Sequence, residues 1–230
     1  MTLSRRHLLA FTAGASLAAG PGRAAAQSYG QRVAVTGDDG RPVANSILPG
    51  EITGQIPGLR GVTYAGPREG QTTLYEFFDF NCPYCRKAAA DVVALHDSDP
   101  DLRIGLVNNP ILSPQSAQAA KVMLAVQRKL GSAAAWNFYW TLLSKPGRID
   151  GPGALTAAAA LGLPQAEVEE IADSEEVRLA LKSQMRMAAD LGLYATPSYV
   201  LGNSGILGHP GANAMAKMIA SIRRCDRLAC

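Results

Sequence analysis

Residues 72–85 read Thr-Thr-Leu-Tyr-Glu-Phe-Phe-Asp-Phe-Asn-Cys-Pro-Tyr-Cys, a strand-like run that becomes helix-like at its end. The part rich in aromatic side chains predicts a buried strand over 72–80. Pro83 suits the first turn of a helix, where its missing N–H is not needed, so residues 83–97 predict a helix. In residues 102–107, large apolar side chains alternate with other residues, and this pattern predicts a second strand. Two strands joined by a helix form a right-handed crossover by default.

Helical patterns fill the chain from Ser113 to Leu191. Ser113 is a suitable N-cap because a proline follows it at the first helical position. Gly131 is expected to separate this helix from a second one, whose aromatic residues should pack in the core rather than line a ligand pocket. Those residues are Trp136, Phe138, Tyr139 and Trp140.

Strand patterns return after this helical block. A strand over 198–201 should follow the Thr-Pro pair at 196–197, and the hairpin signal at 202–205 precedes a short returning strand over 206–207. Residues 211–224 predict a closing helix. The predicted fold class is therefore α/β, with an all-helical subdomain at about 113–191 inserted into a small sheet domain.

The first 26 residues have the three parts of an export signal. Arg5 and Arg6 supply the positive charge, residues 8–19 form an apolar run, and residues 24–26 are a small-residue cleavage site. A buried N-terminal helix is the alternative, but no polar face repeats at helical spacing. The arginine pair resembles the twin-arginine signal, which directs folded proteins across the bacterial inner membrane. We therefore expect a periplasmic protein, in a compartment where disulfides persist.

Composition excludes two classes of protein. Hydrophobic residues make up 47% of the chain and charged residues 18%, which excludes an intrinsically disordered protein. The net charge of +3 falls to zero when Arg5, Arg6 and Arg23 leave with the signal, because the remaining 19 basic residues equal the 19 acidic ones. A nucleic-acid partner is therefore not expected.

Residues 27–70 are rich in glycine, proline and polar turns. We expect an N-terminal extension with a strand over 32–36, closed by a turn at 37–40. The extension could also serve as an oligomerisation or partner arm, so the oligomeric state stays open. Residues 71–230 are expected to form the main domain.

Cys82 lies where the predicted strand becomes a helix. Free N–H groups and the dipole at a helix N-terminus stabilise a thiolate there and lower its pKa. Cys85 follows within one helical turn and can close a disulfide with Cys82. We expect this redox-active disulfide to be the only cofactor. Half of a zinc site is one alternative, a metal-binding or metallochaperone module another, although a zinc site needs four ligands.

Cys225 and Cys230 are predicted to form a structural disulfide in the oxidising compartment. Residues five apart in a continuous helix have Cα atoms about 8 Å apart. Because that exceeds the reach of a disulfide, the closing helix must end near Arg224 or Cys225.

The motif at 76–85, the helical insertion and the segment Ala195-Thr-Pro-Ser-Tyr-Val200 together resemble the DsbA-like family of the thioredoxin superfamily. The resemblance covers residues 72–224. It implies a thioredoxin-like fold and exchange of disulfides with exported protein substrates, with a membrane protein as redox partner.

The resemblance also implies roles for single residues. Cys82 is the attacking thiolate and Cys85 the buried resolving thiol. A cis bond between Thr196 and Pro197 would hold the Thr196 backbone beside Cys82, where a substrate chain could pair with it. An ordinary strand start is the alternative for this Thr-Pro pair.

Glu76 is a third candidate catalytic residue. Strand alternation places it on the same side as Leu74 and Phe78, where an acid is costly without a partner or a role. The family places a buried acid at this spacing, which implies proton transfer to and from Cys85. A salt bridge to a lysine of the insertion is the alternative.

Pro83 and Tyr84 separate the two cysteines and belong to the expected substrate-binding site together with Thr196. The best-known oxidase of the family has histidine at the position of Tyr84 and valine at that of Thr196. Tyr84 with Thr196 looks more like the isomerase and reductase relatives, which are usually dimers or trimers. The direction of exchange is therefore open, with a slight preference for reduction or isomerisation.

Overall fold

The computed structural model describes residues 32–68 and 72–230, so the predicted export signal at 1–26 lies outside the described residues. Six strands form one sheet in the order β1-β6-β5-β3-β4-β2. The strands are β1 (Ala44–Ile47), β2 (Thr63–Ala65), β3 (Thr72–Phe78), β4 (Leu102–Asn108), β5 (Ser198–Leu201) and β6 (Ser204–Leu207). The helices are α1 (Gly50–Thr53), α2 (Pro83–Ser98), α3 (Pro114–Leu143), α4 (Gly151–Ala159), α5 (Gln165–Ala172), α6 (Glu175–Asp190) and α7 (Ala212–Cys225), with a 3₁₀ turn η1 (Ile56–Gly58).

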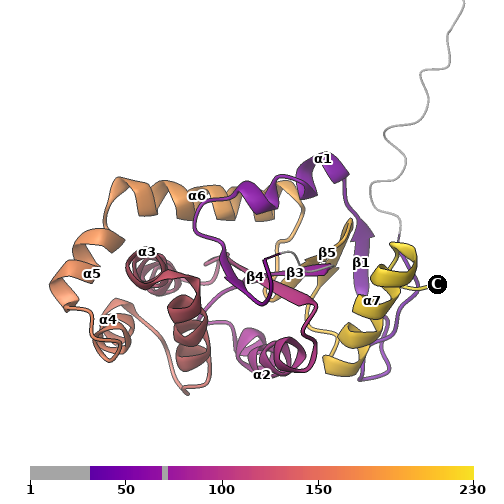
Figure 1. Cartoon of the computed structure of the whole chain (residues 1–230), viewed down its shortest axis with the longest axis horizontal. Helices are drawn as coiled ribbons and strands as arrows, with labels where there is room; N and C mark the ends of the chain where they lie inside the picture. The colour runs from indigo at the N-terminus through magenta and orange to yellow at the C-terminus, as the bar shows by residue number, and fades with distance from the viewer. Residues whose placement is uncertain (1–31, 69–71) are drawn as a thin grey trace, which may run out of the picture.

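The centre of the sheet is the predicted strand–helix–strand unit. β3 runs parallel to β4, and α2 connects them; β5 pairs antiparallel with β3 on its other side. Leu74 and Phe78 point into a core shared with α2, α3 and α7, whereas Phe77 points to the opposite face, into a core that includes residues of α6. Figure 1 shows the sheet between α6 and α2, with α7 near the C-terminus.

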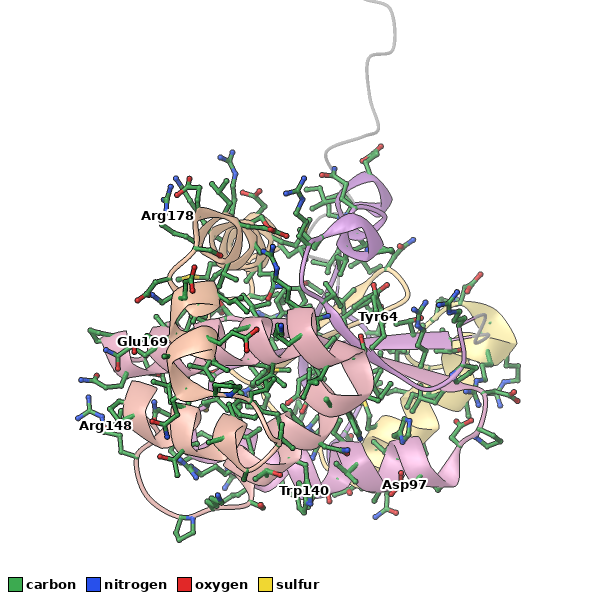
Figure 2. All side chains as sticks on the ribbon, turned by 60° about the vertical axis from the view of Figure 1, so that its left-hand side comes forward. Tyr64, Asp97, Trp140, Arg148, Glu169 and Arg178 are labelled. Atoms are coloured by element: carbon green, nitrogen blue, oxygen red, sulfur yellow. A yellow bond between two sulfur atoms is a disulfide. The ribbon has the colours of Figure 1, made fainter. Side chains whose placement is uncertain are left out.

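Helices α3 to α6 form the insertion between β4 and β5, and they lie together beside the sheet (Figure 1). The Ser113 hydroxyl accepts the Ser116 N–H and caps α3, as predicted. As predicted, two helices meet at Gly131: α3 is broken there by a non-helical conformation, whose φ of 81° suits glycine. Tyr139 packs in the core, but Trp140 is 39% exposed and lies at the surface (Figure 2).

The N-terminal extension forms both edges of the sheet. β1 pairs with β6 at one edge and β2 pairs with β4 at the other. The predicted strand over 32–36 is wrong, since Thr36 makes only an isolated bridge to Pro42. The side chain of Asn45 takes the place of a neighbouring strand here. Its amide oxygen accepts the Val33 N–H, and its amide nitrogen donates to the Val33 C=O.

Candidate active site

The turn between β3 and α2 is held by a buried carboxylate. Asp79 follows the end of β3 and accepts the N–H groups of Asn81 at 2.7 Å and Leu112 at 2.9 Å. Cys82 is then the N-cap residue of α2, with Pro83 at the first helical position. This placement is the one expected from the strand-to-helix change in the sequence.

Asn81 ties this turn to the helical insertion. Its side-chain amide donates to the Ile149 carbonyl at 2.8 Å and to the Ser116 hydroxyl at 3.2 Å, and its oxygen accepts the Ile149 N–H at 2.8 Å. The residue directly before Cys82 is therefore fixed by two segments of the insertion. Sequence reasoning missed Asn81, and an amide beside a reactive cysteine was the available signal.

Cys82 lies beside the segment before β5. Its Sγ is 3.0 Å from the carbonyl oxygen of Thr196, and the Thr196–Pro197 peptide bond is cis. The pKa of Cys82 is lowered to about 6, chiefly by a hydrogen bond from the Cys85 thiol and also by backbone N–H groups at the start of α2; burial acts in the opposite direction. A thiol with this pKa is mostly thiolate at neutral pH and is a strong nucleophile.

Cys85 has the opposite character. It is fully buried, and the Asp79 N–H points at its sulfur from 3.5 Å. Burial raises the pKa of Cys85 far above the usual range, and its hydrogen bond to Cys82 and the charge of Glu76 raise it further. Both cysteines are free thiols here, so the structure shows the reduced form. The pair thus combines a thiolate at the helix end with a protonated thiol beneath it.

Glu76 is fully buried on β3, and its partner is Tyr139 of the insertion. The Tyr139 hydroxyl donates to Glu76 Oε2 at 2.7 Å, while Oε1 has no hydrogen-bond partner among the described residues. The alternative of a salt bridge to a lysine is therefore wrong. Burial raises the pKa of Glu76 to about 8, against the lowering effect of the Tyr139 bond. Glu76 can consequently bind or release a proton near neutral pH.

Four exposed apolar side chains belong to segments that contribute to the site, and we call them the apolar rim: Tyr84, Ile111, Leu112 and Tyr194. Tyr84 lies between the two cysteines and is 64% exposed; Tyr194, at 77%, lies just before Thr196. Leu112 is tied to the turn through Asp79. Large apolar side chains that stay exposed near a reactive thiol suggest contacts with another molecule.

Cys225 and Cys230 form a disulfide at the end of α7. Their Cα atoms are 6.5 Å apart, because α7 ends at Cys225 and Asp226 adopts a left-handed conformation. Arg223, near the end of α7, pairs with Asp99 at the far end of α2. The second cysteine pair is therefore separated from Cys82 by the length of α2.

We expect the double substitution of Cys225 and Cys230 to serine to lower the free energy of unfolding by about 2 kcal/mol, from the entropy of a closed loop this short. Thiol exchange at Cys82 should continue at the rate of the unchanged protein. Chemical denaturation and alkylation with mass analysis would measure both effects. Two alkylatable thiols at these positions in the folded, exported protein would contradict a structural disulfide.

Metal-ligating side chains do not cluster elsewhere in the described ranges. No group of three or more histidine, cysteine or acidic residues with suitable geometry occurs in residues 32–68 and 72–230. The same residues contain no helix that is both long and apolar enough to cross a membrane.

Comparisons with known proteins agree with this geometry. Residues 73–220 match the family model of the DSBA-like thioredoxin domain. A thioredoxin-like oxidoreductase from Silicibacter pomeroyi DSS-3 is 31% identical, with a TM-score of 0.67 over 72% of this chain and 94% of that one. The thiol-disulfide exchange protein alpha-DsbA2 from Wolbachia pipientis has the same TM-score at 20% identity, over 75% of this chain and 94% of that one, so it supports the fold alone.

One curated relative is much longer than this chain. A protein named Na(+)/H(+) antiporter NhaA from Herminiimonas arsenicoxydans is 26% identical over 164 residues, which make up 70% of this chain and 26% of that protein. The chain thus spans about a quarter of this relative. The family match covers more than half of the chain, and it begins in β3, the strand that leads into Cys82 and Cys85. The chain therefore belongs to the DsbA-like thioredoxin-domain family of thiol:disulfide oxidoreductases.

Proposed function

We propose that this protein exchanges disulfides with exported protein substrates through Cys82. The observation that carries the proposal is the pairing of a Cys82 thiol of pKa about 6 with a buried, protonated Cys85. In the reducing direction, the Cys82 thiolate attacks a substrate disulfide and releases one substrate thiolate. Cys85 then loses its proton and attacks Cys82, which releases the second substrate thiolate and leaves the Cys82–Cys85 disulfide. The oxidising direction is the reverse of these steps.

A substrate chain would dock beside Cys82 in an extended conformation. The Thr196 carbonyl faces the Cys82 sulfur at 3.0 Å, where a short added strand could pair with it. The apolar rim supplies contacts for large apolar side chains of the substrate, with Tyr84 and Tyr194 as its most exposed members. Pro83 and Pro197 would fix the two backbone segments that flank the sulfur.

The proposal places the protein in the periplasm. Its support is the signal pattern of residues 1–26 with the arginine pair Arg5-Arg6, which favours the twin-arginine route. The chain then divides into this signal, the extension at 27–70 and the DsbA-like domain at 71–230. A membrane redox partner would restore the starting state of Cys82 and Cys85 after each turnover.

We expect the reduction potential to lie between about −270 mV, as in thioredoxin, and about −120 mV, as in the strong oxidant DsbA, and nearer the former. The thiolates of those two proteins have pKa values of about 7 and about 3.5, and Cys82 at about 6 is closer to the first. A less stabilised thiolate gives a less stabilised reduced form and a lower potential. Equilibration with glutathione would measure it.

The substitution Tyr84→His is the matched comparison for this potential. A partly cationic histidine would stabilise the Cys82 thiolate, so the variant should be more oxidising. The unchanged protein should also re-form native disulfides in a scrambled substrate. A potential near that of the strongest oxidants, with no reductase or isomerase activity, would leave a plain dithiol oxidase.

A further inference from the structure

Three ionisable side chains form a hydrogen-bonded chain that leads from the core to the surface. The Tyr199 hydroxyl lies 2.9 Å from His209 Nδ1, and His209 Nε2 lies 2.8 Å from Asp91 Oδ2. Tyr199 is on β5, His209 follows β6 and Asp91 is on α2. Tyr199 is fully buried, whereas the side chains of His209 and Asp91 are 13% and 40% exposed. This series of hydrogen bonds therefore has a buried end at Tyr199 and a solvent-exposed end at Asp91.

The carboxylate of Asp91 determines which atoms donate and which accept in this series of hydrogen bonds. An ionised Asp91 only accepts, so His209 must carry its proton on Nε2 and donate it to Asp91. Nδ1 of the neutral ring is then an acceptor, and the Tyr199 hydroxyl donates to it. All the bonds thus point outward, from the buried phenol to the exposed carboxylate.

Tyr199, the buried end of this series of hydrogen bonds, lies beside Glu76. In the antiparallel pair of β3 and β5, Glu76 is directly opposite Tyr199. Such residues share a face of the sheet, with Cβ atoms about 4.5–5.5 Å apart. Glu76 is completely buried, and its Oε1 finds no partner in the described part of the chain. A carboxyl that takes part in proton transfer but does not touch water needs a route for its proton.

Other ionisable groups near Tyr199 do not offer this route. Burial raises the pKa of Tyr199, and the charges of Glu76, Cys85, Asp91 and Cys82 raise it further. The two cysteines and Glu76 are themselves buried. Asp91 is the member of this group that reaches solvent, and it is connected to Tyr199 through the histidine.

We propose that Tyr199, His209 and Asp91 relay protons between Glu76 and solvent during disulfide exchange. The inference rests on the proposed function. When Cys85 attacks the mixed disulfide, its S–H proton goes to the Glu76 carboxylate, the new Cys82–Cys85 bond forms and the substrate sulfur leaves with the electron pair. The proton on Glu76 then passes to the Tyr199 hydroxyl, by rotation of the carboxyl or across one water molecule, while the phenol proton moves to His209 and onward to solvent.

The relay residues act through Glu76, so they are positioning residues whose loss should slow one step. The test is a single-turnover reaction of the reduced protein with a labelled peptide disulfide, followed by rapid quenching. The attack by Cys82 depends on peptide concentration, and the later release of the second peptide thiol reports resolution by Cys85. We expect Tyr199→Phe and His209→Gln to slow resolution about tenfold, less than the loss of a group that transfers the proton directly, and to leave the attack rate unchanged.

Two controls separate a relay from a structural contact. His209→Gln keeps an acceptor and a donor in place but cannot carry a proton, so its melting temperature should match that of the unchanged protein. His96→Gln alters another histidine–aspartate pair, with Asp97 at 2.9 Å on the same helix, and should resolve at the normal rate. Imidazole added to His209→Ala should restore resolution as its concentration rises, because it can accept the proton from Tyr199.

The outcomes are distinguishable. Slower resolution in His209→Gln and Tyr199→Phe, with restoration of His209→Ala by imidazole, supports the relay. Resolution within twofold of the normal rate in the first two variants, or no response to imidazole, overturns it. If the unchanged protein itself attacks or resolves no peptide disulfide, the proposed function fails before the relay is reached.

Discussion

Replacement of Cys82 by serine is expected to abolish disulfide exchange, whereas Cys85→Ser should accumulate disulfide-linked complexes with substrate proteins. Cys82 is the thiol whose pKa is lowered to about 6, so it forms the bond with the substrate. Cys85 is buried beneath it and is positioned to release the substrate from that bond. Loss of the first thiol prevents capture, and loss of the second prevents release.

The measurement is non-reducing electrophoresis of exported proteins from cells that carry each variant. Complexes from Cys85→Ser should disappear on reduction and should be absent from a double variant that also lacks Cys82. A variant without Cys225 and Cys230 is the matched control, since it removes a cysteine pair near the end of α2 that is remote from Cys82. Complexes that form without Cys82, or none with Cys85→Ser, would show that the two roles are assigned wrongly.

The parts of this fold that the sequence predicts are those governed by local rules. Pro83 at a helix start, the Ser113 cap and the turn after Leu201 each depend on a few neighbouring residues, and the structure has all three features. The helical insertion between β4 and β5 follows from the length of the helical pattern. The two reactive cysteines are also predictable from neighbouring residues, because their spacing is a local signal.

Contacts between distant segments were not predictable in this way. The Asn45 side chain replaces a strand partner for Val33, which no strand pattern reveals. Tyr139 is predicted to be a core aromatic residue, and its burial is confirmed. Its hydroxyl, however, donates a hydrogen bond to Glu76, which lies 63 positions earlier in the chain. Periodicity shows that a side chain is buried and leaves open which polar atom it meets.

Substitution of Glu76 by glutamine is expected to slow resolution of mixed disulfides by about 100-fold at pH 8, because general acid–base groups contribute this much or more. Burial keeps Cys85 protonated, so its attack needs a nearby base. Glu76 is fully buried and close enough for its charge to raise the pKa of Cys85. Glutamine has nearly the same shape and can still accept the Tyr139 hydroxyl, but it cannot take a proton.

The pH dependence identifies the group responsible. The pKa of Glu76 is about 8, so resolution by the unchanged protein should rise with pH through that value as the carboxylate forms. Glu76→Gln should lack this rise. Tyr139→Phe removes a bond that lowers the Glu76 pKa, so its rise should move to higher pH. A rise near pH 8 that persists in Glu76→Gln would assign it to another group.

Stability measurements on Glu76→Gln would separate a slower chemical step from unfolding. The pKa of Glu76 is raised from 4.5 in the unfolded chain to about 8 in the folded one. The unfolded state therefore releases a proton that the folded state keeps, and the stability of the unchanged protein falls as pH rises between these values. Glutamine removes this loss, so Glu76→Gln should be at least as stable at pH 8 while it resolves more slowly. A variant both slower and less stable at pH 8 would mean that the buried carboxyl supports the fold and not proton transfer.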